Sequence, residues 1–308
     1  MGIIANEYLK KFVCRYNKDV GVPYFCYLDF EGLHQEASSF INSNNVEIRY
    51  FYYYYDNYQT DKIVLFLHGI GPGHTAYLRE IEYLAKEGFK VLTLDYQGCG
   101  ESKGDNLRSL NEPTKDVNDL LDYLKMDTEI VVIGHSLGAY TALNILSLRD
   151  EIIKGVVIAP FISIKSLVFH FTKSHFITSH ILNYEMKAEP SYFDINLLSF
   201  LKETSKNILF IHSIDDPVVP YENATKEVKE LDNSNFEFII ENNKGHNPNY
   251  QKTALDYMNE VFDKYNVLLK KKIINTNEDK INYFKDVSLH KLTLQDEKIM
   301  KKIIDYIK

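Results

Sequence analysis

The chain is poor in cysteine and has no long uninterrupted apolar run. Its 3 cysteines are odd in number and far apart, so they match neither a disulfide framework nor a metal-ligand pattern: Cys14, Cys26 and Cys99. This usage favours a reducing compartment, and we predict a cytoplasmic protein. No apolar segment approaches the ~18 residues of a membrane-spanning helix, and the first residues lack the apolar core of a signal peptide. We therefore expect no integral membrane segment.

The chain also lacks an excess of positive charge. Its net charge is -8 and its pI about 5.7, which argues against a general nucleic-acid-binding protein. The one basic cluster, Lys270–Lys272, is interpreted as a solvated helix end rather than a binding patch. His170, His175 and His180 are five residues apart, so they do not share a helical face, and we predict no metal site. With 45% hydrophobic residues the chain can bury a sizeable core.

Short apolar runs alternate with segments of helical periodicity. A hairpin is predicted first, with strands over Phe40–Ile41 and Val46–Tyr55. Six further strands are predicted over 62–67, 89–94, 130–133, 155–159, 208–211 and 236–240. Because these runs are continuously apolar, we predict an α/β fold with a mainly parallel, doubly wound sheet covered on both faces. Catalytic groups are then expected on loops at the carboxyl ends of the strands.

One segment interrupts this alternation. Residues 161–205 separate two consecutive strands and carry many apolar side chains, so we interpret them as a helical cap subdomain; the alternative is a long crossover packed on the sheet. Residues 1–160 and 206–308 then form the core, with an N-terminal arm and a C-terminal helical extension. Within that extension, residues 264–286 are predicted to be a polar connection and residues 294–307 a final helix.

The central motif lies within Ile130–Ser147. An apolar strand leads into Gly-His-Ser-Leu-Gly, and a helical pattern follows, which places Ser136 at the apex of a strand–turn–helix unit. This is the nucleophile elbow G-x-S-x-G, in which small residues are needed two positions before and after the serine because the backbone crowds there. We predict that Ser136 is a catalytic nucleophile.

A serine nucleophile needs a base and an acid that orients the base, and in this motif they follow in the order acid, then histidine. The acid is expected after the strand at 208–211, where Asp215 and Asp216 compete; we prefer Asp216, which stands in D-x-x-V-P. Either aspartate also fits a structural turn before a proline. The base is expected after the last strand, where His246 follows a glycine, and His290 has no strand before it.

An oxyanion hole would complete the site. One donor is the backbone N–H of Leu137, which follows the serine, and the other is expected from the loop after the strand at 62–67, where Ile70 is the candidate. His135, the variable residue of the elbow, is expected to point away from the chemistry.

Four motifs in this order resemble the α/β-hydrolase superfamily over residues 47–265. They are HGIG from His68, DYQGCGESKG from Asp95, GHSLG around Ser136, and DDPVVP with GH at Asp216 and His246. Gln97 stands where arginine is usual in the second motif, a departure that we interpret as structural. The resemblance implies a capped esterase, lipase or lysophospholipase-like serine hydrolase that needs no cofactor.

We therefore expect a small-molecule carboxylic ester with an apolar group as substrate, cleaved through an acyl-enzyme. The same residues fit an amidase, an aminopeptidase or a thioesterase. A small-molecule binding protein on the same scaffold is the alternative outside enzymology, and the sequence leaves the oligomeric state open, a homo-oligomer included.

Overall fold

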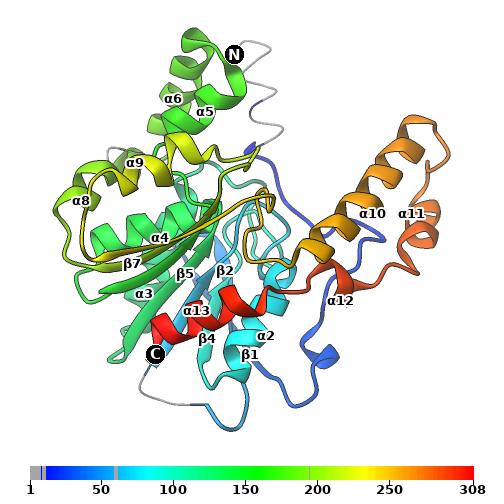
Figure 1. The fold of residues 1–308 in the computed structure, drawn as a ribbon, viewed down its shortest axis with the longest axis horizontal. Helices are drawn as coiled ribbons and strands as arrows, with labels where there is room; N and C mark the ends of the chain where they lie inside the picture. Colours follow the sequence, from blue (N-terminus) through cyan, green and yellow to red (C-terminus); the bar gives the residue numbers. More distant parts are fainter. Residues whose placement is uncertain (1–7, 9–11, 59–61, 194) are drawn as a thin grey trace.

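A single eight-stranded sheet organises the computed structural model, which describes all residues except 1–7, 9–11, 59–61 and 194 (Figure 1). The strand order is β1-β2-β4-β3-β5-β6-β7-β8. Strands β3 to β8 pair in parallel, whereas β1 and β2 pair antiparallel at one edge. The bounds are β1 His34–Ile41, β2 Glu47–Tyr54, β3 Lys62–Leu67, β4 Lys90–Leu94, β5 Glu129–His135, β6 Lys154–Ile158, β7 Asn207–Ser213 and β8 Phe236–Glu241. The predicted mainly parallel α/β sheet is confirmed.

Helices cover both faces of the sheet. Successive residues of β3 show why its sequence is continuously apolar: Leu65 belongs to the hydrophobic core under α3 (Glu112–Leu124) and α4 (Leu137–Leu148). Val64 belongs to a second core under α2 (Leu78–Lys86) and α13 (Glu297–Ile307). Both side chains are fully buried. A strand enclosed on both faces has no need of alternating polar residues.

The segment between β6 and β7 forms four helices, α5 Ile164–Thr172, α6 His175–Ala188, α7 Pro190–Phe193 and α8 Leu197–Glu203. Helices α5 and α6 lie against each other and project from the body of the molecule, whereas α8 packs on α4 (Figure 1). Leu167 and Ile181 anchor the two projecting helices in the larger core. That these helices act as a cap stays a prediction.

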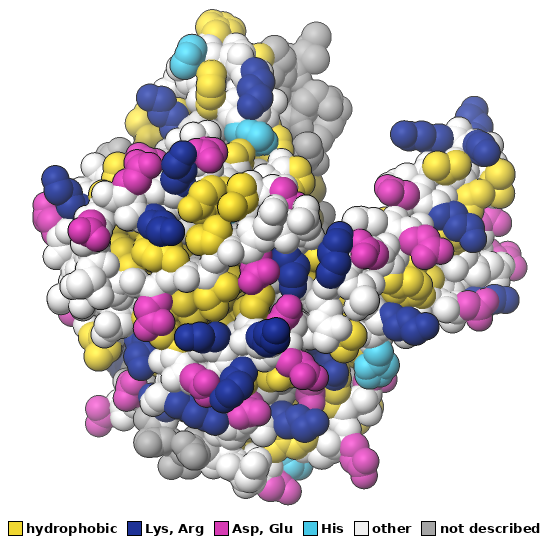
Figure 2. Space-filling model, in the orientation of Figure 1, with side chains coloured by type: hydrophobic (Ala, Val, Ile, Leu, Met, Phe, Trp, Pro, Cys, Tyr) yellow, Lys and Arg dark blue, Asp and Glu magenta, His cyan; other side chains and the backbone are white. Residues whose placement is uncertain are grey.

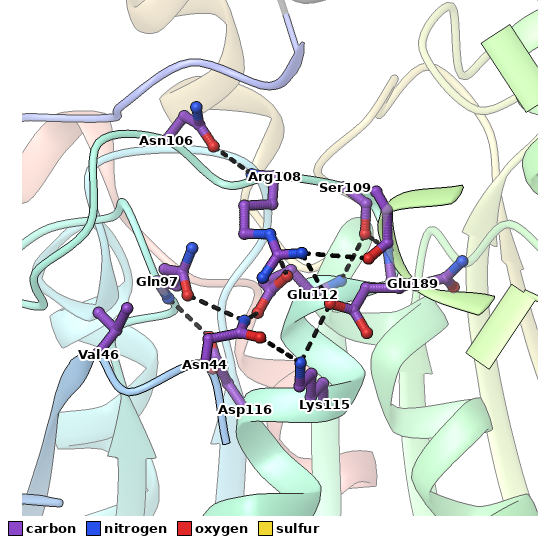
Figure 3. A network of polar contacts seen from close by, with 12 residues as sticks. Asn44, Val46, Gln97, Asn106, Arg108, Ser109, Glu112, Lys115, Asp116 and Glu189 are labelled. Atoms are coloured by element: carbon purple, nitrogen blue, oxygen red, sulfur yellow. Dashed lines mark hydrogen bonds and ion pairs between the residues drawn. The ribbon is translucent and has the colours of Figure 1, made fainter. Parts of the chain in front are cut away.

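Two buried glutamates fix the end of α6 to the sheet domain. Glu185 accepts hydrogen bonds from the Tyr8 hydroxyl, at 2.7 Å, and from the Leu110 backbone N–H, at 2.9 Å. Glu189, just after α6, forms ion pairs with Lys115 on α3, at 3.2 Å, and with Arg108, at 3.6 Å (Figure 3). The projecting helices are therefore held by directional polar contacts as well as by apolar packing.

The predicted polar connection at residues 264–286 is wrong. Helix α10 runs through Lys252–Lys270 and α11 through Asn277–Phe284, followed by the short α12, Leu289–Leu292. Together α10 and α11 form an arm that extends away from the sheet (Figure 1). A small separate core lies there, formed by Val261, Phe284 and Leu292. Each of the three helices has few buried apolar residues, and those of this core pack against one another. No helix in the described parts of the chain is both long and apolar enough to cross a bilayer.

Candidate active site

The turn between β5 and α4 is a tightly packed elbow. Ser136 has φ 55° and ψ -117°, a backbone conformation that non-glycine residues rarely adopt. A Cβ atom at Gly134 would lie 2.1 Å from the Gly138 carbonyl oxygen, and one at Gly138 would lie 2.0 Å from the Leu67 carbonyl oxygen. Both positions therefore require glycine, as the motif predicts. The turn leaves Ser136 partly exposed at the start of α4.

The predicted site residues meet at the carboxyl edge of the sheet. His246 Nε2 lies 2.9 Å from Ser136 Oγ, and His246 Nδ1 lies 2.8 Å from Asp216 Oδ2. The three side chains come from the loops after β5, β7 and β8, which are far apart in sequence. Both distances are normal for hydrogen bonds, so the three residues form a continuous chain from hydroxyl to carboxylate.

Asp216 is held by more groups than the sequence predicts. Its Oδ1 accepts from the backbone N–H groups of Val218, at 2.8 Å, and Val219, at 2.9 Å. His212, fully buried at the end of β7, places Nε2 3.3 Å from Oδ2. Burial alone would raise the pKa of Asp216, but the hydrogen bonds from His212, His246 and the backbone outweigh it, so its pKa lies well below the ordinary value.

Asp215, the competing aspartate, has different partners. Its Oδ1 accepts from the Ser213 hydroxyl at 2.5 Å and from the Gly245 N–H at 3.4 Å, and the residue is exposed. Burial is the largest single effect and would raise its pKa, yet the hydrogen bonds together outweigh it and lower the pKa of Asp215. Asp215 thus braces the loop that carries the histidine, whereas Asp216 contacts the histidine ring itself.

The two candidate oxyanion donors lie on segments next to the serine. Leu137 is the first residue of α4, where backbone N–H groups have no acceptor within the helix. The loop after β3 passes close by, since a Cβ atom at Gly69 would stand 3.3 Å from Ser136 Cβ. Ile70, the next residue, is partly buried. Its N–H group is therefore on a loop that borders the serine.

Two family models match adjoining parts of the chain. One, described as serine aminopeptidase S33, matches residues 58–190, and another, described as TAP-like protein, matches residues 190–265. The lysophosphatidylserine lipase ABHD12 of Bos taurus is 30% identical over 183 residues, which is 53% of this chain and 44% of that protein. An epoxide hydrolase of Caballeronia sordidicola is 32% identical over 105 residues, 32% of each chain. The chain thus spans less than half of these curated relatives.

Solved structures resemble the chain over most of its length. The Pyrococcus furiosus esterase Pf2001 aligns with a TM-score of 0.60 and 25% identity, covering 84% of this chain and 98% of the esterase. The chain belongs to the α/β-hydrolase superfamily. Mouse α/β hydrolase domain-containing protein 10, at 18% identity and a TM-score of 0.53 over 77% of this chain and 99% of its own, shares the fold.

In this chain, His135 does not point away from the site as expected. Its Nε2 lies 2.8 Å from the His246 carbonyl oxygen, and its Nδ1 lies 2.9 Å from the Tyr77 hydroxyl. A carbonyl oxygen only accepts, so Nε2 carries the proton and Nδ1 accepts from Tyr77. Burial, and then the neighbouring His246, lower the pKa of His135 to about 3, which keeps the ring neutral. His135 therefore links the elbow to the loop that carries His246.

The glycine-rich loop after β4 is held by hydrogen bonds of its own. Asp95 accepts from the Glu101 N–H at 2.8 Å and from both the N–H and the ring of His74, at 2.7 and 2.8 Å. Gln97, in place of the usual arginine, is buried and accepts from Asn44 at 3.1 Å within the network of Figure 3. Asp95 and Gln97 thus form hydrogen bonds that hold this loop together.

The described residues contain no group of three or more His, Cys, Asp or Glu side chains arranged to hold a metal ion. Cys14, Cys26 and Cys99 are unpaired. His212 and Tyr77 are the members of the site that sequence reasoning missed. The available signal for His212 was a histidine at the end of the strand that precedes the acid, four residues before it. Nothing local marks Tyr77, which lies 58 residues from its partner.

Proposed function

We propose that this α/β-hydrolase is a serine hydrolase that cleaves carboxylic esters with an apolar group. The observation that carries the proposal is the hydrogen-bonded chain from Ser136 through His246 to Asp216, with distances of 2.9 and 2.8 Å. A serine hydroxyl is a weak nucleophile alone, and this arrangement supplies the base and the carboxylate that it needs. A receptor that only binds would not require all three side chains in hydrogen-bonding order.

In the proposed mechanism, Ser136 Oγ attacks the ester carbonyl while His246 Nε2 accepts its proton. Asp216 stays ionised, fixes the ring orientation and stabilises the imidazolium that forms. The N–H groups of Leu137 and Ile70 bind the oxyanion. His246 then protonates the leaving alcohol, an acyl-enzyme on Ser136 remains, and water activated by His246 releases the acid.

A cavity beside α4 offers space for the part of the substrate beyond the reacting ester. It has a volume of about 490 Å³ and lies between α4 and the helices α5 to α8. Its wall includes Tyr140, one helical turn after Ser136, and the apolar side chains of Ile162, Leu182 and Leu197. This position supports the proposal that residues 161–205 act as a cap that selects the substrate. Ester cleavage is also supported by two similar proteins, one of which is named a lipase and the other an esterase.

An amide substrate is the second candidate, because the family model over residues 58–190 is described as a serine aminopeptidase. The same attack and proton transfers would cleave an amide or a thioester. We favour the ester because a lipase and an esterase are among the proteins that the chain resembles. The unpaired cysteines favour a cytoplasmic location for this activity.

Hydrolysis of p-nitrophenyl esters of increasing chain length tests the proposal, with aminoacyl p-nitroanilides as the amide comparison. We expect ester hydrolysis with a chain-length optimum, and its loss in Ser136→Ala and His246→Ala variants that remain folded by circular dichroism. Ester hydrolysis that persists in Ser136→Ala would contradict the assignment of the nucleophile. Anilide hydrolysis without ester hydrolysis would favour the peptidase.

A further inference from the structure

The end of the helical arm combines exposed lysines with exposed aliphatic side chains. We define the arm tip as residues 264–276, the last turns of α10 and the connection to α11. It contains four exposed lysines, Lys264, Lys270, Lys271 and Lys272, and no acidic residue. This composition contrasts with the net charge of -8 of the whole chain. In Figure 2, dark-blue side chains gather around yellow ones at the end of the arm.

Three of the five aliphatic side chains of the arm tip are exposed, whereas Ile274 is buried and Leu268 is half-buried. Val267 is 47% exposed, Leu269 37% and Ile273 59%. The chain reverses at Lys272, where φ is 55°, and the Ile273 N–H donates to the Leu268 carbonyl oxygen at 3.0 Å. The reversal presents aliphatic and basic residues together at one end. The negative end of the α10 dipole would account for lysines at the end of this helix, because it favours positive charge there. It does not account for the exposed aliphatic side chains beside them.

We propose that the arm tip docks on a membrane surface that contains anionic phospholipids. Lysines near such a surface are attracted by its negative potential, and aliphatic side chains gain by entering the boundary between headgroups and acyl chains. The carboxylates nearest in sequence are Asp263, Glu278 and Asp279. Asp279 is occupied as the cap of α11, where it accepts from the N–H groups of Asn275 and Thr276 at 2.9 Å.

The root of the arm is fixed next to the loop of His246. Helix α10 begins at Lys252, six residues after His246. The N–H of Gln251, just before the helix, donates to the Leu294 carbonyl oxygen at 2.9 Å. Lys244, on the same loop, pairs with Asp296 at 2.8 Å. Helix α10 then holds the tip roughly 27 Å from this root, given the rise of an α-helix. Docking through the tip would orient the site relative to the membrane and leave its hydrogen bonds unchanged.

Flotation with lipid vesicles tests the proposal. We expect the full chain to bind phosphatidylcholine vesicles that contain about one third phosphatidylglycerol, and not vesicles of phosphatidylcholine alone. The Lys270→Gln, Lys271→Gln, Lys272→Gln triple variant should lower the partition coefficient on the order of 100-fold, about fivefold for each lysine. A Val267→Ser, Ile273→Ser variant should bind more weakly while its remaining binding stays sensitive to salt.

A matched control removes three exposed lysines from α13, with Lys298→Gln, Lys301→Gln and Lys302→Gln. This variant should bind as the wild type does. The proposal is overturned if the wild type does not prefer anionic vesicles or if the control loses as much binding as the tip variants. It is also overturned if the tip substitutions alter the oligomeric state in light scattering, because the tip would then contact a second copy.

Vesicle binding is measured without substrate, so its outcome is separate from that of the proposed hydrolysis. Tip variants should hydrolyse a short soluble ester as the wild type does. If no variant and no wild-type protein hydrolyses esters, the proposed function fails while the binding result still decides the docking proposal.

Discussion

At the scale of single residues, Asp216 is the most constrained member of the site. Two backbone N–H groups occupy one carboxylate oxygen, and His246 and His212 face the other. These contacts lower its pKa although burial opposes ionisation, so the carboxylate stays charged across the neutral range. An ionised carboxylate in a fixed position is what the histidine needs in order to present Nε2 to the serine.

Substitution of the two adjacent aspartates should separate their roles. We expect Asp216→Asn to lower kcat by up to about 10⁴-fold, because the amide cannot stabilise the imidazolium and permits the wrong tautomer of His246. Asp215→Asn should cost less than about tenfold, since it disturbs only hydrogen bonds to Ser213 and Gly245 and no contact with the His246 ring. Steady-state kinetics on a p-nitrophenyl ester measures both. The reverse order of effects would show that Asp215 is the acid.

Tyr77 should act on catalysis through His135. Tyr77→Phe keeps the aromatic ring but removes the hydroxyl that donates to His135 Nδ1. His135 can then adopt the other tautomer, in which Nε2 no longer donates to the His246 carbonyl oxygen. We expect kcat to fall by roughly tenfold, the value of one hydrogen bond, with KM little changed. Tyr283→Phe is the control, because its hydroxyl donates to the Val261 carbonyl oxygen at 2.6 Å within the arm. Equal kcat losses in both variants would reduce Tyr77 to a structural role.

The residues of the candidate site were predictable to different degrees. Ser136, Asp216 and His246 follow from local motifs, because a nucleophile elbow and the loops after late strands leave a signal in short stretches of sequence. His135 was expected to point away from the chemistry because it is the variable residue of the elbow, and its two partners, 58 and 111 residues away, left no local signal. Contacts of that kind depend on how loops meet at the sheet edge, which no single segment specifies.

At the scale of elements, Glu185 makes the attachment of α6 sensitive to pH. Burial raises its pKa to about 7 from the ordinary value of 4.5, although hydrogen bonds from Tyr8 and Leu110 oppose the shift. A carboxyl whose pKa is higher in the folded state stabilises the fold most below the unfolded value. This contribution is lost as the pH rises through about 7, when the buried group must ionise.

The Glu185→Gln variant should therefore gain stability relative to the wild type as the pH rises from about 5 to about 8. The change in the difference between their free energies of unfolding should be roughly 3 kcal/mol at most. Urea unfolding at several pH values measures it, and other buried carboxyls cancel because they are common to both proteins. Glu203→Gln, at an exposed position on α8, should show no such trend. A constant difference for Glu185→Gln would contradict the shift.

Strands were predicted better than the C-terminal helices. The continuous apolar run at 62–67 has the same bounds as β3, because a strand buried on both faces leaves an unbroken signal. Helices α10 and α11 were missed, because each has only a few buried residues and the two complete their small core against each other. A helix that is stabilised mainly by packing against the next helix shows only a weak apolar periodicity in its own sequence.

At the scale of the whole molecule, one edge of the sheet gathers the candidate chemistry. The loops after β3, β5, β7 and β8 converge there. The helices between β6 and β7 and the arm after β8 also begin at that edge. Strand order explains the convergence, since parallel neighbours all end on the same side. We propose that Ser136, at this edge, forms a covalent intermediate.

The most direct test is the site of covalent labelling. The folded protein would be treated with a fluorophosphonate probe, digested and analysed by mass spectrometry, with Ser136→Ala as the control. We expect a single phosphonylated serine, Ser136, and no adduct in the variant. An adduct on another residue, or none on folded protein that accepts the probe in its cavity, would contradict the assignment of the nucleophile.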